Sequence, residues 1–249
     1  MNGWAVYQSY VGRMLARASL YQSGGAFGFR DQLQDAVNLL ATEPSLARER
    51  IIDACAHQYA EGDVMHWWHR GRPDKGVRTR ISDDLIWLPW AVCEYMDATG
   101  DGGILDQKVA GIVSAPLAPG EDSRYESAEG DGQSERVLAQ AASALGCGLR
   151  RGFGRHGRLL MGTGDWCDGF DAVGSEGKGE SVWLSEFFAH TAGRFAALLE
   201  ARGDTPGAAA LMSAVRRCVK GVERAWDGEW YRRGYFDDGA PLGSKESGG

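Results

Sequence analysis

Segments with apolar residues at helical spacing alternate along this chain with long glycine-rich loops, and this alternation most constrains the fold. In the first segment, Val6, Tyr10 and Met14 recur every four residues, as on one face of a helix. Such spacing, with capping residues and prolines at several helix ends, predicts helices over residues 3–19, 31–41, 44–60, 83–99, 134–149, 181–201 and 207–226. Hardly any strand signal lies between them. We therefore predict an all-α fold of helical hairpins.

The loops between these helices carry the chemically active residue types. The loops over residues 21–29, 61–80 and 161–181 are rich in glycine, of which the chain has 36, and together contain Trp, Arg, His and Asp. Loops longer than about 12 residues in a compact domain are usually functional or disordered, and this composition favours function. An indole face packs well on the apolar face of a sugar ring, so the loops suit a carbohydrate site, although glycine and tryptophan also serve in turns and cores.

Charge and cysteine usage exclude several classes of protein. The net charge of −7, with no Lys/Arg-rich tract, argues against a nucleic-acid binder. The five cysteines are scattered without a CxxC pair, which indicates reduced thiols rather than a disulfide framework or a zinc site. No apolar run approaches the roughly 20 residues needed to cross a bilayer, and the N-terminus lacks a signal peptide. We expect a cytoplasmic protein with no membrane segment and no metal.

Arg30 and Asp31 stand where a glycine-rich loop becomes a helix. Helix N-termini attract anions, and an arginine there can fork onto a phosphate or carboxylate while an aspartate accepts bonds from sugar hydroxyls. A capping aspartate with a surface salt bridge is the alternative interpretation.

The stretch over residues 66–90 combines four indoles with basic and acidic residues. Trp87 and Trp90 lie at helical spacing and are expected in the core, whereas the loop residues Trp67 and Trp68 are candidates for a sugar platform. His66 and His69 lack a third ligand, which argues against zinc. The acids after Ser82 either cap the next helix or orient an arginine in the site. The candidate polar residues here are Arg78, Arg80 and Asp84.

The loop over residues 161–181 places Asp165 and Asp168 on either side of Trp166 and Cys167. A carboxylic acid beside an indole in a dry pocket has its pKa raised, as a general acid at neutral pH requires. Either aspartate can take that role. A calcium loop competes for the same acids, but the EF-hand pattern needs ligands at every second position and this loop lacks them.

Several long motifs, in order along the chain, resemble glycoside hydrolase family 94, the inverting β-glucoside phosphorylases, and in particular the phosphorylase-like domain of cyclic β-1,2-glucan synthases. Ordered agreement at several motifs is far more specific than any single motif. The motifs are YQSGGAFGFRDQLQD (21–35), HWWH (66–69), GVRTRISDDLIWLPWAV (76–92), LAPGEDSRYE (117–126), LMGTGDWCDGFDAVGSEGKGESVWL (160–184) and WDGEWYRRGYFDDGAPLGS (226–244).

The resemblance implies an (α/α)6 toroid with the inter-helix loops lining its cavity. It also implies the reaction, in which phosphate attacks the anomeric carbon of a β-glucosyl unit and releases α-glucose 1-phosphate. The substrates are then a β-glucan oligosaccharide and inorganic phosphate, with no cofactor. Phosphate is a competent nucleophile, so one protein acid suffices. Relatives point to a homodimer or to a place within a larger polypeptide.

By resemblance, the second aspartate of the family motif GDWNDG is the general acid, which falls on Asp168. Trp166 matches the indole of the donor-sugar subsite, Asp31 a sugar-hydroxyl ligand and Arg30 a residue at the phosphate position. Cys167 and Phe170 stand where the family usually has asparagine and methionine. Arg78, Arg80 and Asp84 match the family at the level of the motif, and their role in substrate binding is our inference. Asp165 and Trp67 complete the substrate-binding candidates.

The sequence stops just after the PLGS motif, where relatives continue with a phosphate-binding histidine and threonine. We therefore expect a partial catalytic domain over residues 1–244, a toroid incomplete at its C-terminus, and a disordered tail over residues 245–249. The alternative function is a catalytically incomplete, glucan-binding fragment of a larger synthase. A hydrolase using water ranks last, because it needs a base roughly 6.5–9.5 Å from the acid and nothing in the sequence places one.

Overall fold

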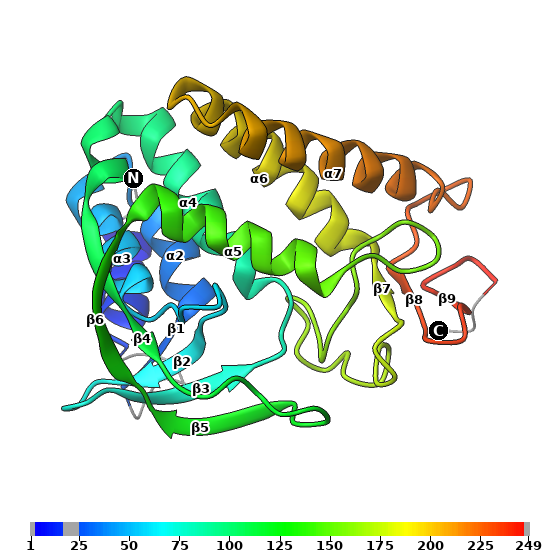
Figure 1. Ribbon diagram of the computed structural model, residues 1–249, viewed down its shortest axis with the longest axis horizontal. Coiled ribbons are helices and arrows are strands. Elements are labelled where there is room, and N and C mark those ends of the chain that lie inside the picture. The colour runs from blue at the N-terminus through cyan, green and yellow to red at the C-terminus, as the bar shows by residue number, and fades with distance from the viewer. Residues whose placement is uncertain (1–2, 17–24, 247–249) are drawn as a thin grey trace. The chain divides into compact units, whose positions relative to one another are not determined.

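The computed structural model describes residues 3–16 and 25–246 (Figure 1). Part of the first family motif, residues 21–24, and the last three residues of the expected tail lie outside the described residues. The chain forms two compact units, which we describe separately: Met1–Thr79 with Trp87–Ala144, and Arg80–Ile86 with Leu145–Gly249. In the described part of the chain, no helix combines the length and the apolar character that crossing a membrane requires.

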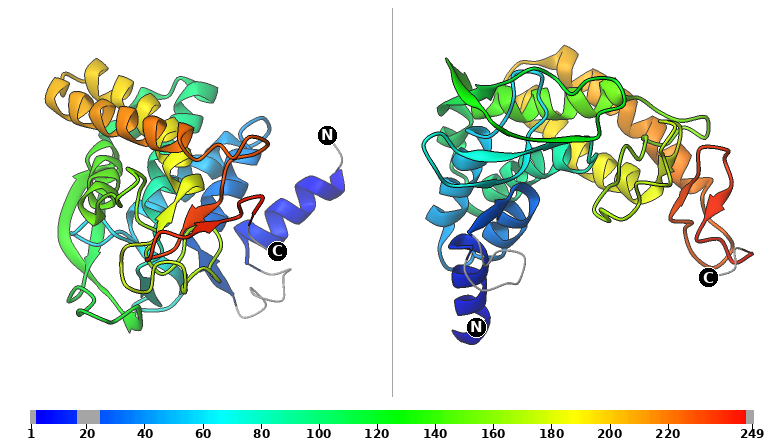
Figure 2. Two further views of the ribbon diagram at one scale, coloured as in Figure 1. Left: turned by 90° about the vertical axis from the view of Figure 1, so that its right-hand side faces the viewer. Right: turned by 90° about the horizontal axis from the view of Figure 1, so that it is seen from below.

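The predicted helices are present, with ends shifted by a few residues. The first begins as α1 (Gly3–Gln8) and continues as a π-helix (Ser9–Met14). Figure 2 shows α1 extending away from the rest of its unit, and none of its side chains is buried. The others are α2 (Phe29–Asn38), α3 (Pro44–Cys55), α4 (Asp84–Thr99), α5 (Val137–Arg151), α6 (Val182–Ala201) and α7 (Thr205–Glu223), with a short 3₁₀ helix over Gly102–Asp106.

The expectation of an all-α toroid is wrong, because the described residues also form three antiparallel sheets (Figure 1). In the first unit, a four-stranded sheet has the order β1 (Ala26–Gly28), β2 (Met65–His69), β3 (Lys75–Thr79) and β5 (Ser123–Ser127). A two-stranded sheet pairs β4 (Lys108–Val113) with β6 (Glu129–Arg136). In the second unit, β7 (Glu180–Ser181), β8 (Gly234–Tyr235) and β9 (Pro241–Leu242) form a small sheet.

Several strands lie in segments that the sequence analysis interpreted as loops, and the end of β6 replaces the predicted start of the helix over residues 134–149. The loop over residues 61–80 is a hairpin in which Trp67 pairs with Val77 and Trp68 with Gly76. A Cβ on Gly76 would lie 2.4 Å from the carbonyl oxygen of Trp67, so glycine permits this close approach. The acidic stretch over residues 119–135 supplies β5 and most of β6. These strands are rich in Glu, Ser and Gly and lack apolar alternation, so local sequence does not reveal them.

The core of the first unit lies where α2 and α3 pack together and α2 meets β2. Trp68 is almost fully buried there, with its ring stacked on His57 at a centroid distance of 3.8 Å. Other fully buried side chains are Phe29, Leu33, Ile51, Cys55 and Met65.

In the second unit, α6 and α7 lie side by side as an antiparallel hairpin (Figure 1). Ser181 caps α6 by accepting from the N–H of Leu184, and Asp204 caps α7 by accepting from the N–H of Gly207. The apolar faces bury Phe188 and Phe195 on α6 and Leu211 and Cys218 on α7. Both helices begin and end within three residues of the bounds predicted from the sequence.

Candidate active site

The second unit carries the loop that contains both candidate proton donors, and we call residues 165–170 the acid loop. Asp165 begins it and is fully buried. Its Oδ2 accepts from the hydroxyl of Ser181 (2.6 Å), while its Oδ1 accepts from Arg233 Nη2 (2.5 Å) and the N–H of Cys167 (3.0 Å). Asp165 therefore ties the loop to the cap of α6 and to the residue before β8. This geometry suits an anchoring role better than contact with a substrate.

Two side chains that follow Asp165 in the acid loop are exposed to solvent. Asp168 is exposed, and Trp166 has 54% of its surface exposed. The dry pocket that we expected around the acid is therefore not formed within the described residues of this unit. Cys167 contributes its backbone N–H to the turn, a contact that asparagine at this position would keep, so the departure from the family motif changes the side chain alone.

The segment before α4 lies against the acid loop. Ser82 donates through both its N–H and its hydroxyl to the carbonyl of Gly164, each at 2.9 Å. Arg151 at the end of α5 donates to the carbonyls of Arg80 (2.8 Å) and Ile81 (2.9 Å). Arg80 is half-buried, and Asp84 is buried in the first turn of α4. This setting suits the helix-start interpretation of Asp84 and leaves Arg80 within the same unit as Asp168.

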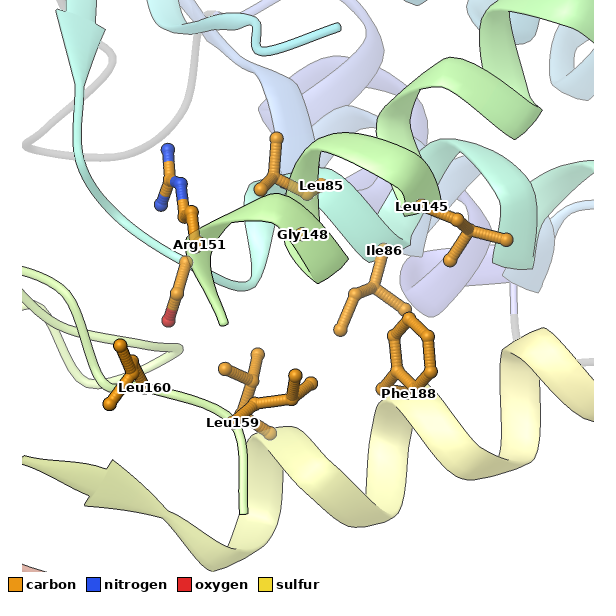
Figure 3. A pocket seen from close by; sticks show the side chains of 10 residues that line it. Leu85, Ile86, Leu145, Gly148, Arg151, Leu159, Leu160 and Phe188 are labelled. Atoms are coloured by element: carbon orange, nitrogen blue, oxygen red, sulfur yellow. The ribbon is translucent and has the colours of Figure 1, made fainter. Parts of the chain in front are cut away.

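A small hollow lies inside this unit, between the start of α4, the end of α5 and α6 (Figure 3). Its volume is about 10 Å³, and a cavity needs roughly 10–15 Å³ of such space to hold one water. The hollow is thus a packing gap and not a sugar site. Its apolar lining comes from Leu85, Ile86, Leu145, Leu159, Leu160, Leu184 and Phe188.

The glycine-rich segment after the acid loop is held by Asp237. The carboxylate of Asp237 accepts from the N–H groups of Glu176 (2.9 Å), Lys178 (2.8 Å) and Gly179 (2.8 Å). Burial alone would raise the pKa of Asp237, but these backbone donors bring it below its usual value. The DDG motif near the C-terminus thereby shapes a loop about 60 residues earlier, and nothing in the local sequence indicates this contact.

Arg30 and Asp31 lie in the first turn of α2 in the other unit, as predicted. Arg30 is 8% exposed. Asp31 is half-buried and pairs with Arg13 (3.1 Å), in agreement with the salt-bridge alternative. The carboxylate of Asp31 folds back over Gly28, where a Cβ would come within 2.1 Å of its Oδ2. Glycine at position 28 is therefore what lets the acid lie at this helix start.

Trp67 and Trp68, the expected sugar platform, are consecutive residues of strand β2 and therefore do not share a face. Successive side chains of a strand point to opposite faces, so Trp68 enters the core while Trp67 stays half-exposed. Trp67 lies 5.7 Å from the ring of Tyr125 on β5, which is 55% exposed. Tyr125 belongs to the family motif over residues 117–126, but the sequence analysis did not select it. A strand assignment for that motif would have revealed it.

The guanidinium of Arg78 is held by other groups of the protein. Its side chain is buried, and its guanidinium donates to Asp63 (both bonds 2.7 Å), to Glu61 (3.0 Å) and to Ser114 and Ala115. It also stacks on the ring of Tyr59 at 3.9 Å. These contacts use its N–H groups within the protein, so the geometry is that of a structural residue. Trp87 is buried as predicted, and Trp90 packs edge-on against it at 5.2 Å.

No cluster of three or more His, Cys, Asp or Glu side chains suited to a metal ion occurs among the residues that the structure describes.

The candidate site residues are distributed over the two compact units. Arg80, Asp84, Asp165, Trp166 and Asp168 belong to the second unit, and Arg30, Asp31, Trp67 and Arg78 to the first.

Comparison with known proteins gives a consistent set of relatives. The model of the glycosyl hydrolase 94 superfamily catalytic domain matches residues 1–248. The chain is 45% identical over 250 residues to the cyclic beta-(1,2)-glucan synthase NdvB of Rhizobium meliloti (strain 1021), covering 100% of this chain and 9% of the synthase. It is 33% identical over 220 residues to solabiose phosphorylase of Paenibacillus borealis, covering 87% of this chain and 25% of that enzyme.

A more distant relative is the N,N'-diacetylchitobiose phosphorylase of Vibrio furnissii, 26% identical over 283 residues that cover 99% of this chain and 32% of that enzyme. The chain thus spans between 9% and 32% of the length of these curated relatives.

Proposed function

The chain belongs to the glycosyl hydrolase 94 superfamily, and we propose that it carries the proton donor of an inverting phosphorolysis site. Its relatives include glycoside phosphorylases, so the family consists of enzymes that act on sugars. The proposed substrates are β-1,2-linked glucan and inorganic phosphate. The linkage is inferred from the identity with the cyclic beta-(1,2)-glucan synthase, which extends over the whole chain.

In the proposed reaction, a phosphate oxygen attacks the anomeric carbon of a β-glucosyl unit from the face opposite the glycosidic oxygen. The bond between that carbon and the glycosidic oxygen breaks, and the carboxylic acid of Asp168 gives its proton to the departing oxygen. The products are α-glucose 1-phosphate and the shortened glucan. Phosphate replaces the water of an inverting hydrolase, so no second carboxylate is needed to activate the nucleophile.

The remaining candidates have distinct roles in this proposal. The Trp166 indole packs on the donor sugar, Asp31 accepts a bond from a sugar hydroxyl and Arg30 binds the phosphate. Arg80 contributes to substrate binding from the segment before α4. The proposed reaction uses no cofactor, because phosphate supplies the nucleophile and Asp168 supplies the proton.

One observation carries the proposal, namely the contrast between the two aspartates of the acid loop. Asp165 is buried and accepts hydrogen bonds from three groups, whereas Asp168 is exposed at the turn that Asp165 holds. The loop is therefore anchored at its first acid and presents its second acid to an incoming ligand. A proton donor on a fixed loop meets the positional demand of general acid catalysis.

The test is incubation of the protein with β-1,2-glucooligosaccharides and phosphate, followed by measurement of glucose 1-phosphate. Asp168→Asn should abolish product formation and leave glucan binding, measured by calorimetry, within about threefold of wild type, since an amide cannot donate the required proton. Asp171→Asn is the matched control, because Asp171 is another exposed acid that lies just after the acid loop. Its activity should equal that of wild type. A folded wild-type sample that forms no glucose 1-phosphate would contradict the proposal.

Glucan binding without turnover is the second candidate. It is favoured by the exposure of Trp166, because an indole face that is open to solvent can pack on a sugar ring whether or not a reaction follows. Calorimetric binding of β-1,2-glucan in the absence of any product would support this function, and robust phosphorolysis would exclude it.

A further inference from the structure

Arg233 contacts both ends of the acid loop although it lies 63 or more residues later in the sequence. Its Nη2 donates to Asp165 at the start of the loop (2.5 Å), and its guanidinium lies over the ring of Phe170 at the end of the loop, 4.8 Å from the centroid. Its Nη1 donates to the hydroxyl of Ser181 (3.2 Å), which itself donates to Asp165. The side chain of Arg233 thus contacts the first and the last residue of the acid loop, and Asp168 lies between these two residues in the sequence.

The backbone of Arg233 is itself held in place. Its N–H donates to the carbonyl of Leu242 in β9 (2.9 Å), and its carbonyl accepts from the N–H of Val182 at the start of α6 (3.2 Å). The side chain is about three-quarters buried, with 28% of its surface exposed, and the indole of Trp183 lies 5.9 Å from the guanidinium. The arginine is therefore a rigid support rather than a mobile surface group.

The electrostatics explain why an arginine is needed at this position. Asp165 is fully buried, and a buried carboxylate is costly unless it is paired and hydrogen-bonded. The guanidinium donates to Asp165 and Ser181 from two nitrogens while its carbon lies over the ring of Phe170, whereas a lysine ammonium offers a single point charge. The phenyl ring at position 170, where the family usually has methionine, supplies the face on which the cation lies.

We propose that Arg233 is a positioning residue of the active site, which sets the orientation of Asp168 by fixing Asp165 and Phe170. The consequence for catalysis rests on the proposed function, while the effect on the loop does not. Because displacement of a catalytic group by about 1 Å can cost about 10²-fold in rate, loss of Arg233 should lower kcat about 100-fold. KM should change less than about threefold, because the guanidinium of Arg233 is directed at Asp165, Ser181 and Phe170 of the protein itself.

The experiment compares Arg233→Met and Arg233→Lys in the full chain. Arg232→Met is the matched control, because the neighbouring arginine pairs with Asp227 and the hydroxyl of Tyr235 instead of with the acid loop. The first readout is amide hydrogen exchange of residues 165–170 and of α6, which needs no activity. The second is kcat and KM for phosphorolysis. We expect faster exchange confined to the acid loop in Arg233→Met, an intermediate effect in Arg233→Lys and none in Arg232→Met.

Two results would overturn the proposal. One is exchange of residues 165–170 in Arg233→Met at the wild-type rate, and the other is an equal increase over α6, which indicates general destabilisation. If Arg233→Met does not fold, Asp165→Asn serves in its place and should loosen the same six residues. If the wild-type protein makes no glucose 1-phosphate, the proposed function fails while the exchange result still decides the role of Arg233. If the wild type is active and Arg233→Met keeps its kcat, the positioning role fails alone.

Discussion

Replacing Glu180 by glutamine removes one charge of a buried cluster in the second unit, and we expect it to destabilise that unit strongly. The carboxylate of Glu180 is 1% exposed. Its Oε1 accepts from the N–H of His156 (2.8 Å), and its Oε2 pairs with His156 Nδ1 (2.6 Å) and lies 3.6 Å from Nη1 of the buried Arg158. The Arg158 guanidinium also lies over the ring of Tyr235, 4.4 Å from the centroid.

The magnitude follows from what the substitution leaves behind. Breaking a buried ion pair by removing one partner costs about 3–5 kcal/mol, since the other charge stays buried without compensation. The side-chain oxygen of glutamine can still accept from the backbone N–H of His156. Its amide group, however, carries no charge, and its NH₂ places a hydrogen-bond donor next to the Arg158 guanidinium. We therefore expect a loss of about 3 kcal/mol, at the lower end of that range. Burial lowers the pKa of Arg158, so this position disfavours an uncompensated positive charge.

The assay is native-state hydrogen exchange of the α6 and α7 amides, because it reports the free energy of opening of this unit alone. Glu176→Gln is the control. Glu176 pairs with Lys178 at 2.8 Å, but both side chains are 67% exposed, and the variant should match wild type. Adding Arg158→Met to Glu180→Gln should recover part of the loss, because it removes the stranded cation.

A loss below about 1 kcal/mol, the range of an exposed pair, would refute the reasoning. So would a double variant that is less stable than Glu180→Gln alone, because the cost would then come from lost packing and not from the uncompensated charge.

Two further predictions concern a strand and a loop. Gly76→Ala should lower the free energy of unfolding by about 1–3 kcal/mol, because its Cβ would lie 2.4 Å from a backbone oxygen. Gly193→Ala is the control and should not lower it, because its Cβ would meet nothing within 4 Å. Urea unfolding of both variants measures the difference. Asp237 has a lowered pKa, so its charge contributes stability above the unfolded value of 3.8 that is lost as pH falls through the folded pKa. The stability difference between wild type and Asp237→Asn, measured by urea unfolding between pH 3 and 6, should therefore shrink on acidification, and a difference that grows would contradict the assignment.

Part of this molecule could be predicted from the sequence because the relevant signals are local. The hairpin of α6 and α7 follows from apolar residues three and four apart and from the caps Ser181 and Asp204, all within single segments. The helix start at Arg30 is visible for the same reason. The ordered motifs indicated the family, and the match of the family model confirms it.

The sheets could not be predicted, because strand pairing joins distant segments. Tyr125 and Trp67 lie on the same sheet face because both pair with Val77 of β3. The polar segments around Tyr125 carry no apolar alternation that would indicate a strand. The all-α expectation failed at these segments, where backbone hydrogen bonds between strands outweigh weak local preference.

The same division applies to the candidate site. The sequence determined that two aspartates flank an indole in one short loop. Only the family resemblance favoured Asp168 as the acid, since both aspartates have the same chemistry and similar neighbours. Tertiary structure decided that Asp165 is buried against Arg233 and that Asp168 faces solvent. It likewise directed Arg78 onto Asp63 and Arg233 onto the acid loop. A charged side chain takes its role from the groups it meets after folding, and those groups come from elsewhere in the chain.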